Sequence, residues 1–256
     1  MRSEWRRFTG SVRRISDVAD IILVANVKDP GLLKIDSVHA SVMLQRETGV
    51  EAAPVVTIRD FNRAEFLSTM LAVFASGLKS VMVAWGDDFA KGVRASNVRD
   101  YPDLAGAIRE AAQVRSRVGS DTLILAPVDL RTLGTRAGAA RARSRLAAGA
   151  GLLLAQPPTT DSQGSFLNHT SLAEKAGLGG RVLLGVFPFK SESDLTRYER
   201  LFGWALPADI HEEAKGGEGR LLEVERDVVR RIRRKGLPGV YLSTRGDPGV
   251  ARALLS

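Results

Sequence analysis

The chain has 256 residues, of which 44% are hydrophobic and 26% are charged, and this is the composition of a globular protein with a full core. It contains no Cys, which excludes disulfides, iron–sulfur clusters and thiol catalysis, and its three His are too far apart in sequence to suggest a metal site. The formal charge is +8, but the Arg residues are spaced along expected helices, so we interpret them as a solvated face and expect no nucleic-acid partner.

No stretch of the sequence approaches the roughly 20 continuous apolar residues that a membrane span requires. The Arg-rich N-terminus lacks the apolar core and cleavage site of a signal peptide. We therefore expect a cytoplasmic protein with no membrane partner.

Seven short runs rich in Val, Ile and Leu predict strands of a parallel sheet, because strands covered on both faces lose the alternation of polar residues. In chain order they are Ile21–Val27, Pro54–Arg59, Ser80–Trp85, Thr122–Pro127, Gly151–Gln156, Val182–Phe187 and Gly239–Thr244. Apolar residues at helical spacing predict helices between them, at Arg63–Ser76, Asp103–Arg117, Thr135–Ala148, Ser191–Phe202 and Leu221–Arg234. Long loops are expected at Gly86–Asp100, Pro157–Ser171, which includes His169, and Leu206–Gly219.

This alternation predicts an α/β fold, a (βα)8 TIM-type barrel formed as a single domain over residues 1–256. A closed barrel needs eight strands, and only seven runs are clear. The first strand is therefore short, degenerate or missing, and Ser3–Phe8 is the segment that could supply it. Otherwise the barrel is incomplete or is closed by a partner chain.

The carboxyl ends of barrel strands converge on one site, so polar residues just after the strands are candidates for function. Asp87 follows the third expected strand in Trp85-Gly86-Asp87-Asp88, where it can hold a polar ring or cap the following segment. Gln156 ends the fifth expected strand, where its amide can bind a ligand or satisfy the loop backbone. We find no dinucleotide fingerprint, P-loop or Ser-His-Asp order.

Several short motifs occur in one order along the chain: TGVEAAP at residues 48–54, Gly86-Asp87 at a strand end, Ala148-Gly149-Ala150 before the strand that ends in Gln156, WALPA at 204–208 and VYLSTR at 240–245. In this order they resemble methylenetetrahydrofolate reductase, a flavin-dependent barrel enzyme of one-carbon metabolism and methionine biosynthesis. The corresponding segments of that family read TGLEAAPH, RGD, AGA followed by TQFFFD, RIPAW and FYTLN. The resemblance covers roughly residues 18–256.

The resemblance implies an oxidoreductase that uses FAD, takes hydride from NADH or NADPH, and reduces a methylene-pterin C1 carrier such as a folate to its methyl form. Asp87 matches a catalytic aspartate near the flavin and the pterin. Gln156 matches a glutamine that hydrogen-bonds the pterin ring. Ala126 matches the strand that passes the flavin, and Arg145 matches a basic residue near the FAD phosphates.

The sequence also departs from the family pattern. The family's catalytic acid is a Glu in an EFFPP-like first strand, and Glu4 is the acid here that could replace it. Val55 and Trp85 stand where the family has a His and an Arg. The alternative is therefore a barrel without flavin that acts as a pterin-binding or regulatory subunit. We expect a homo-oligomer or assembly with a partner subunit.

Overall fold

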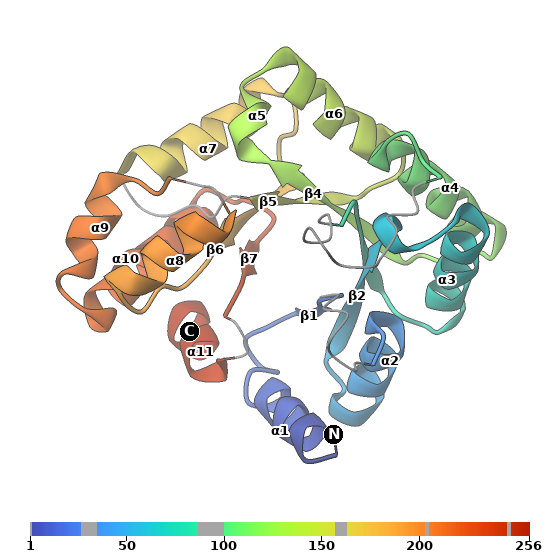
Figure 1. Cartoon of the computed structure of the whole chain (residues 1–256), viewed down its shortest axis with the longest axis horizontal. Coiled ribbons are helices and arrows are strands. Elements are labelled where there is room, and N and C mark those ends of the chain that lie inside the picture. Colours follow the sequence, from blue (N-terminus) through green and yellow to red (C-terminus); the bar gives the residue numbers. More distant parts are fainter. Residues whose placement is uncertain (1, 27–34, 87–99, 157–162, 203–204, 245–246) are drawn as a thin grey trace. The chain divides into compact units, whose positions relative to one another are not determined.

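A computed structural model describes residues 2–26, 35–86, 100–156, 163–202, 205–244 and 247–256 (Figure 1). Hydrogen-bonded neighbours follow the order of the chain from the first strand to the last, and the registers of four neighbouring pairs are parallel. All seven predicted runs are confirmed as strands: β1 (Ile21–Val24), β2 (Glu51–Thr57), β3 (Ser80–Ala84), β4 (Leu123–Asp129), β5 (Leu152–Gln156), β6 (Val182–Val186) and β7 (Val240–Leu242).

Helices join each strand to the next, which is the topology of a TIM-type barrel. The described residues hold seven strands, one fewer than a full barrel. The helices are α1 (Arg2–Arg13), α2 (Ser37–Thr48), α3 (Arg63–Ala75), α4 (Leu104–Arg117), α5 (Leu130–Leu133), α6 (Arg136–Ala147), α7 (Gln163–Lys175), α8 (Glu192–Phe202), α9 (Ala208–Ala214), α10 (Glu218–Arg234) and α11 (Pro248–Leu255), with a 3-10 turn η1 (Ile58–Asp60) after β2.

The expectation that Ser3–Phe8 supplies an eighth strand is wrong, because this segment lies within α1. Its inward residues recur at helical rather than strand spacing: Trp5 is half-buried, and Thr9 and Val12 are buried. They pack α1 against α2, and the Arg residues between them point to solvent.

Two expected loops are also wrong. Residues 157–171 include the start of α7, so His169 lies on a helix, and residues 206–219 include α9 and the first turn of α10. The helices α7 and α9 carry many polar residues, so their apolar pattern is weak and tertiary packing must supply most of their stability. Most of the third loop, at 86–100, lies outside the described residues.

The chain forms two compact units, and the prediction of a single domain stays a prediction. Unit 1 comprises Met1–Pro127 and Arg143–Leu153, and unit 2 comprises Val128–Ala142 and Leu154–Ser256. One core cluster of unit 1 joins α1, α2 and β2 through Val12, Leu44, Val50 and Ala52, and side chains of β1 pack against it. The corresponding cluster of unit 2 is aromatic, with Phe187, Phe189 and Tyr198 packed edge to face.

Side-chain caps fix where several helices begin, and so where the preceding segments must end. Asp36 accepts a hydrogen bond from the His39 N–H at 2.9 Å at the start of α2. Asn62 does the same for the Glu65 N–H at 2.8 Å in α3, soon after β2 ends. These caps hold the turns on the side of unit 1 where the strands finish.

Candidate functional site

Gln156 lies where the sequence predicts it, as the last residue of β5 in unit 2. Its position is fixed by Leu153, Leu154 and Ala155, which are at most 1% exposed. Gln156 itself is half-buried. Within the described ranges no hydrogen bond joins its amide to another residue, so both its donor and its acceptor remain for a ligand.

Asp87, the predicted catalytic partner of Gln156, lies outside the described residues. Its role stays a prediction. The residue before it, Gly86, is described and has a positive φ of 84°. A Cβ added at Gly86 would lie 3.0 Å from Arg59 Cβ and 3.1 Å from Thr57 Cβ, so only glycine fits where the chain leaves β3 beside the end of β2.

A polar cluster at the carboxyl ends of β1 and β2 was missed from the sequence. The Asn26 amide donates to Thr57 Oγ1 at 3.3 Å, and the Arg59 N–H donates to the Trp85 carbonyl at 3.1 Å. Thr57 and Arg59 are only 6% and 5% exposed. The available signal was the polar TIRD segment directly after an apolar run, which we interpreted only as the end of a strand. A buried guanidinium at this edge gives unit 1 a fixed positive charge.

Glu4 lies on the exposed side of α1. The indole of its neighbour Trp5 donates to Glu47 Oε1 at 2.9 Å, four residues before β2 begins. This is the edge of unit 1 where strands start, whereas TIM-type active sites lie where strands end. The structure therefore gives the catalytic role of Glu4 no support.

The two predicted flavin contacts gain no support either. Ala126 is completely buried within β4. Arg145 is half-buried in the last turn of α6, and its guanidinium donates to the carbonyl of Pro127 in the same unit. A guanidinium has five N–H donors, so this one bond neither supports nor excludes a phosphate there, and both flavin contacts stay predictions.

The last two strands of unit 2 lead into an aromatic cluster that sequence reasoning also missed. Phe187 packs edge to face on Tyr241 of β7 and on Tyr198 of α8, with ring centroids 5.7 and 5.6 Å apart. Burial raises the pKa of the Tyr241 hydroxyl. The rings are packed on one another, so the cluster forms a rigid support rather than an open stacking surface.

His169 on α7 is a half-buried titratable group of unit 2. Burial lowers the pKa of its imidazole to about 4, so the ring is neutral at pH 7. It is therefore not a cationic partner for an anionic ligand near neutral pH.

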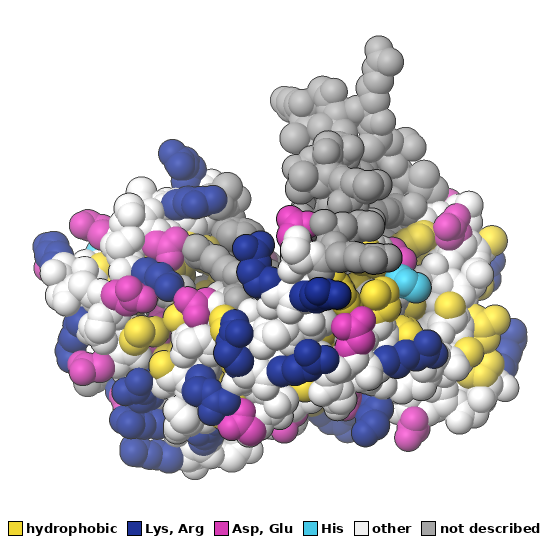
Figure 2. All heavy atoms as spheres, turned by 90° about the horizontal axis from the view of Figure 1, so that it is seen from below, with side chains coloured by type: hydrophobic (Ala, Val, Ile, Leu, Met, Phe, Trp, Pro, Cys, Tyr) yellow, Lys and Arg dark blue, Asp and Glu magenta, His cyan; other side chains and the backbone are white. Residues whose placement is uncertain are grey.

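Charge on the described surface is mixed. On the face shown in Figure 2, Lys and Arg side chains alternate with Asp and Glu and do not gather into one basic patch. Among the described residues, no group of three or more His, Asp and Glu is arranged to hold a metal ion. In the same part of the chain, no helix has the length and apolar character needed to cross a bilayer.

No known family's sequence model matches the chain, and no curated protein matches it either. The resemblance to methylenetetrahydrofolate reductase therefore has no independent confirmation from sequence. Solved structures do match.

An uncharacterized protein from Clostridium thermocellum that binds two copies of 5-methyl-5,6,7,8-tetrahydrofolic acid matches with a TM-score of 0.67 and 12% identity, covering 98% of this chain and 88% of that one. A chitinase from Rhizomucor miehei matches with a TM-score of 0.56 and 15% identity, covering 94% of each chain. A 2,3-dimethylmalate lyase of the PEP mutase/isocitrate lyase superfamily matches with a TM-score of 0.51 and 17% identity, covering 93% of this chain and 88% of that one. These likenesses establish the TIM-barrel-like fold, which hosts many unrelated activities.

Proposed function

We propose that the protein binds a reduced folate or a related pterin C1 carrier, with Gln156 as a ligand of the pterin ring. The observation that carries this proposal is the half-buried Gln156 amide at the carboxyl end of β5, without a hydrogen bond to any other described residue. A pterin presents ring N–H, amino and carbonyl groups side by side, and a carboxamide is the side chain that can donate and accept at once. The methyltetrahydrofolate bound by the structural neighbour supports the same ligand class.

The experiment is calorimetric titration of the protein with 5-methyltetrahydrofolate. We expect saturable binding that Gln156→Ala weakens by about five- to 150-fold, because a lost pair of buried hydrogen bonds costs about 1–3 kcal/mol. Gln113→Ala, at an exposed position of α4, is the matched control and should bind like the parent protein. Equal affinity of Gln156→Ala and the parent protein would show that Gln156 does not bind the ligand. Absence of any titration signal would end the proposal.

The finer proposal is a flavin-dependent reductase that converts the methylene form of the carrier to the methyl form. FAD would supply the redox chemistry and NADH or NADPH the hydride, with Asp87 beside the reacting ring. This proposal rests on the sequence resemblance, since neither Ala126 nor Arg145 adds to it. The alternative is a pterin-binding or regulatory subunit without flavin.

A visible spectrum and an FAD titration distinguish the two. A yellow protein that oxidises NADH or NADPH with a methylene-pterin acceptor is the reductase. A colourless protein that binds 5-methyltetrahydrofolate but not FAD is the binding subunit, and its elution volume in gel filtration then tests for self-association or a copurifying partner chain.

A further inference from the structure

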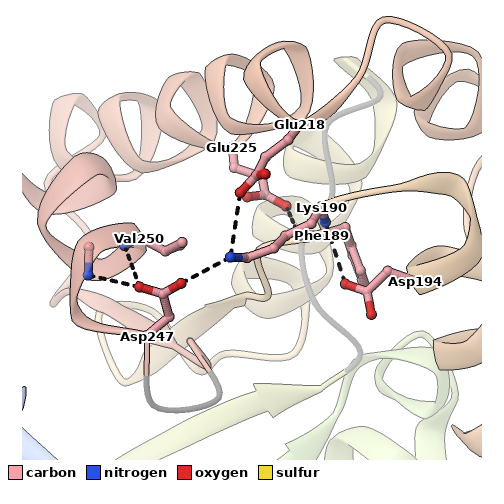
Figure 3. A network of polar contacts seen from close by, with 8 residues as sticks. Phe189, Lys190, Asp194, Glu218, Glu225, Asp247 and Val250 are labelled. Carbon is pink, nitrogen blue, oxygen red and sulfur yellow. Dashed lines mark hydrogen bonds and ion pairs between the residues drawn. The ribbon is translucent and has the colours of Figure 1, made fainter.

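Glu225 is a carboxyl group enclosed within unit 2. It lies on α10 and is 1% exposed. Its Oε1 accepts a hydrogen bond from the Phe189 N–H at 2.9 Å, three residues after β6 ends (Figure 3). Its Oε2 is buried and has no hydrogen-bond partner among the described residues. Such a group is rare in a folded protein and calls for an explanation.

The segment that Glu225 holds is fixed from two helices at once. The next N–H along the chain, that of Lys190, donates to Asp194 Oδ2 of α8 at 3.4 Å. Two consecutive backbone N–H groups therefore end on two carboxyl groups, one from α10 and one from α8. The Phe189 ring is completely buried and packs edge to face on Tyr198 at 5.2 Å. Release of the Phe189 N–H would have to disturb this packing.

No described cation is turned toward Glu225. The nearby ammonium is that of Lys190, and it lies 2.9 Å from Asp247 at the start of α11 and 3.5 Å from Glu218 in the first turn of α10 (Figure 3). Lys190 thus already faces two carboxylates.

The remaining groups around Glu225 do not compensate a negative charge. The carboxyl of Asp194 on α8 acts on it electrostatically, and the neighbouring aromatic cluster around Phe189 contains the phenols of Tyr198 and, packed against it, Tyr241 of β7. Burial raises the pKa of Glu225 well above its ordinary value, Asp194 adds to the rise, and the Phe189 N–H opposes it.

We propose that Glu225 is a proton-linked latch that holds the segment Phe187–Lys190 in place after β6 while protonated and releases it when the proton is lost. Ionised Glu225 would be a buried charge with one N–H donor and no counter-ion, and such a state is strongly unfavourable. The charge is relieved when water enters or when Lys190 leaves Asp247 and Glu218 to pair with it. Either event moves Phe189 and Lys190 from their present places. The latch does not depend on the proposed function.

Hydrogen exchange of the Phe189 and Lys190 amides between pH 5.5 and 8.5, corrected for the intrinsic rate, tests the latch in the intact protein without ligand. Opening that releases one proton becomes tenfold more favourable per pH unit, so protection should fall about tenfold per unit. In Glu225→Gln, which keeps an acceptor for the Phe189 N–H but cannot ionise, protection should not depend on pH. Glu223→Gln, whose side chain is 66% exposed on the same helix, is the matched control and should behave as the parent protein.

Parallel pH dependence in the parent protein and Glu225→Gln would overturn the latch. A carbon-13 titration of the Glu225 carboxyl in the unmutated protein gives a second test, and ionisation in the range of an exposed glutamate would also overturn it. Because the test uses the protein without ligand, failure of 5-methyltetrahydrofolate to bind would leave the latch unaffected.

Discussion

His169 shows how one half-buried side chain sets a pH limit on stability. Its folded pKa is about 4, against 6.5 for an ordinary His. The unfolded chain therefore takes up a proton as pH falls through 6.5, and the folded protein does so only near 4. The free energy of unfolding therefore decreases as pH falls from about 6.5 to about 4, by about 3 kcal/mol in total.

We expect His169→Gln to remove this dependence. Urea unfolding of the parent protein and the variant at pH 7 and pH 4 measures it, and the parent should lose about 3 kcal/mol more than the variant between the two pH values. His39→Gln on α2 is the control and should retain the loss. A variant that loses as much stability as the parent would show that His169 is not buried in neutral form.

At the residue scale, the sequence predicted the site unevenly. Gln156 was predictable because a polar residue that closes an apolar run is expected at the end of the strand. Arg59 was not, because its burial depends on the packing of Gly86 against β2, which no local pattern reveals. Glu225 was hidden for a similar reason, since α10 carries many charged residues and only tertiary contacts show which one faces inward.

At the scale of elements, Gly86 determines how closely the ends of β2 and β3 approach. Any side chain there meets both an unfavourable positive φ and the Cβ atoms of Thr57 and Arg59. Gly119 isolates the first effect, because it has a φ of 66° and no heavy atom within 4 Å of its added Cβ.

We therefore expect Gly119→Ala to cost about 1–2 kcal/mol through backbone strain alone. Gly86→Ala should cost a further 1–3 kcal/mol or so, the usual range for overpacking. Midpoints of urea unfolding give both values if the slopes agree. Equal losses in the two variants would show that the ends of β2 and β3 tolerate a methyl group, and that Gly86 serves only the turn.

Strands were predicted better than helices. The seven runs are short, β-branched and free of polar alternation, and each became a strand. The wrong assignments fell on α1, α7 and α9, where charged or polar residues dilute the apolar spacing, and α2, α5 and α11 were not predicted at all. In α1 the inward positions 5, 9 and 12 carry Trp, Thr and Val, so one polar residue interrupts the pattern that would identify a helix.

At the scale of the whole molecule, His169 and Glu225 act on stability in opposite directions. The folded pKa of Glu225 lies well above the ordinary value of 4.5, so the unfolded chain releases its proton first, and stability falls as pH rises from about 4.5 toward the folded value. Between pH 4.5 and 6.5 the stability gained through His169 offsets this loss. Above 6.5 only the loss remains.

We expect their joint contribution to be flat between about pH 4.5 and 6.5 and to fall above it by up to about 1.4 kcal/mol per pH unit. It is measured as the difference between the unfolding curves of the parent protein and the double variant His169→Gln/Glu225→Gln from pH 4.5 to 8.5. A difference that rises with alkaline pH would reverse the assigned sign for Glu225.

The start of α11 is capped by a carboxylate of the chain itself. In TIM-type barrels a short helix after the last strands often receives a phosphate at its N-terminus. Here Asp247 Oδ1 already accepts from the Gly249 and Val250 N–H groups at 2.9 and 3.3 Å. The carboxylate of Asp247 thus takes the place at this helix end that a phosphate occupies in such barrels. The two N–H groups that a phosphate would need are therefore already bound within the chain, and the ammonium of Lys190 beside Asp247 is bound there as well.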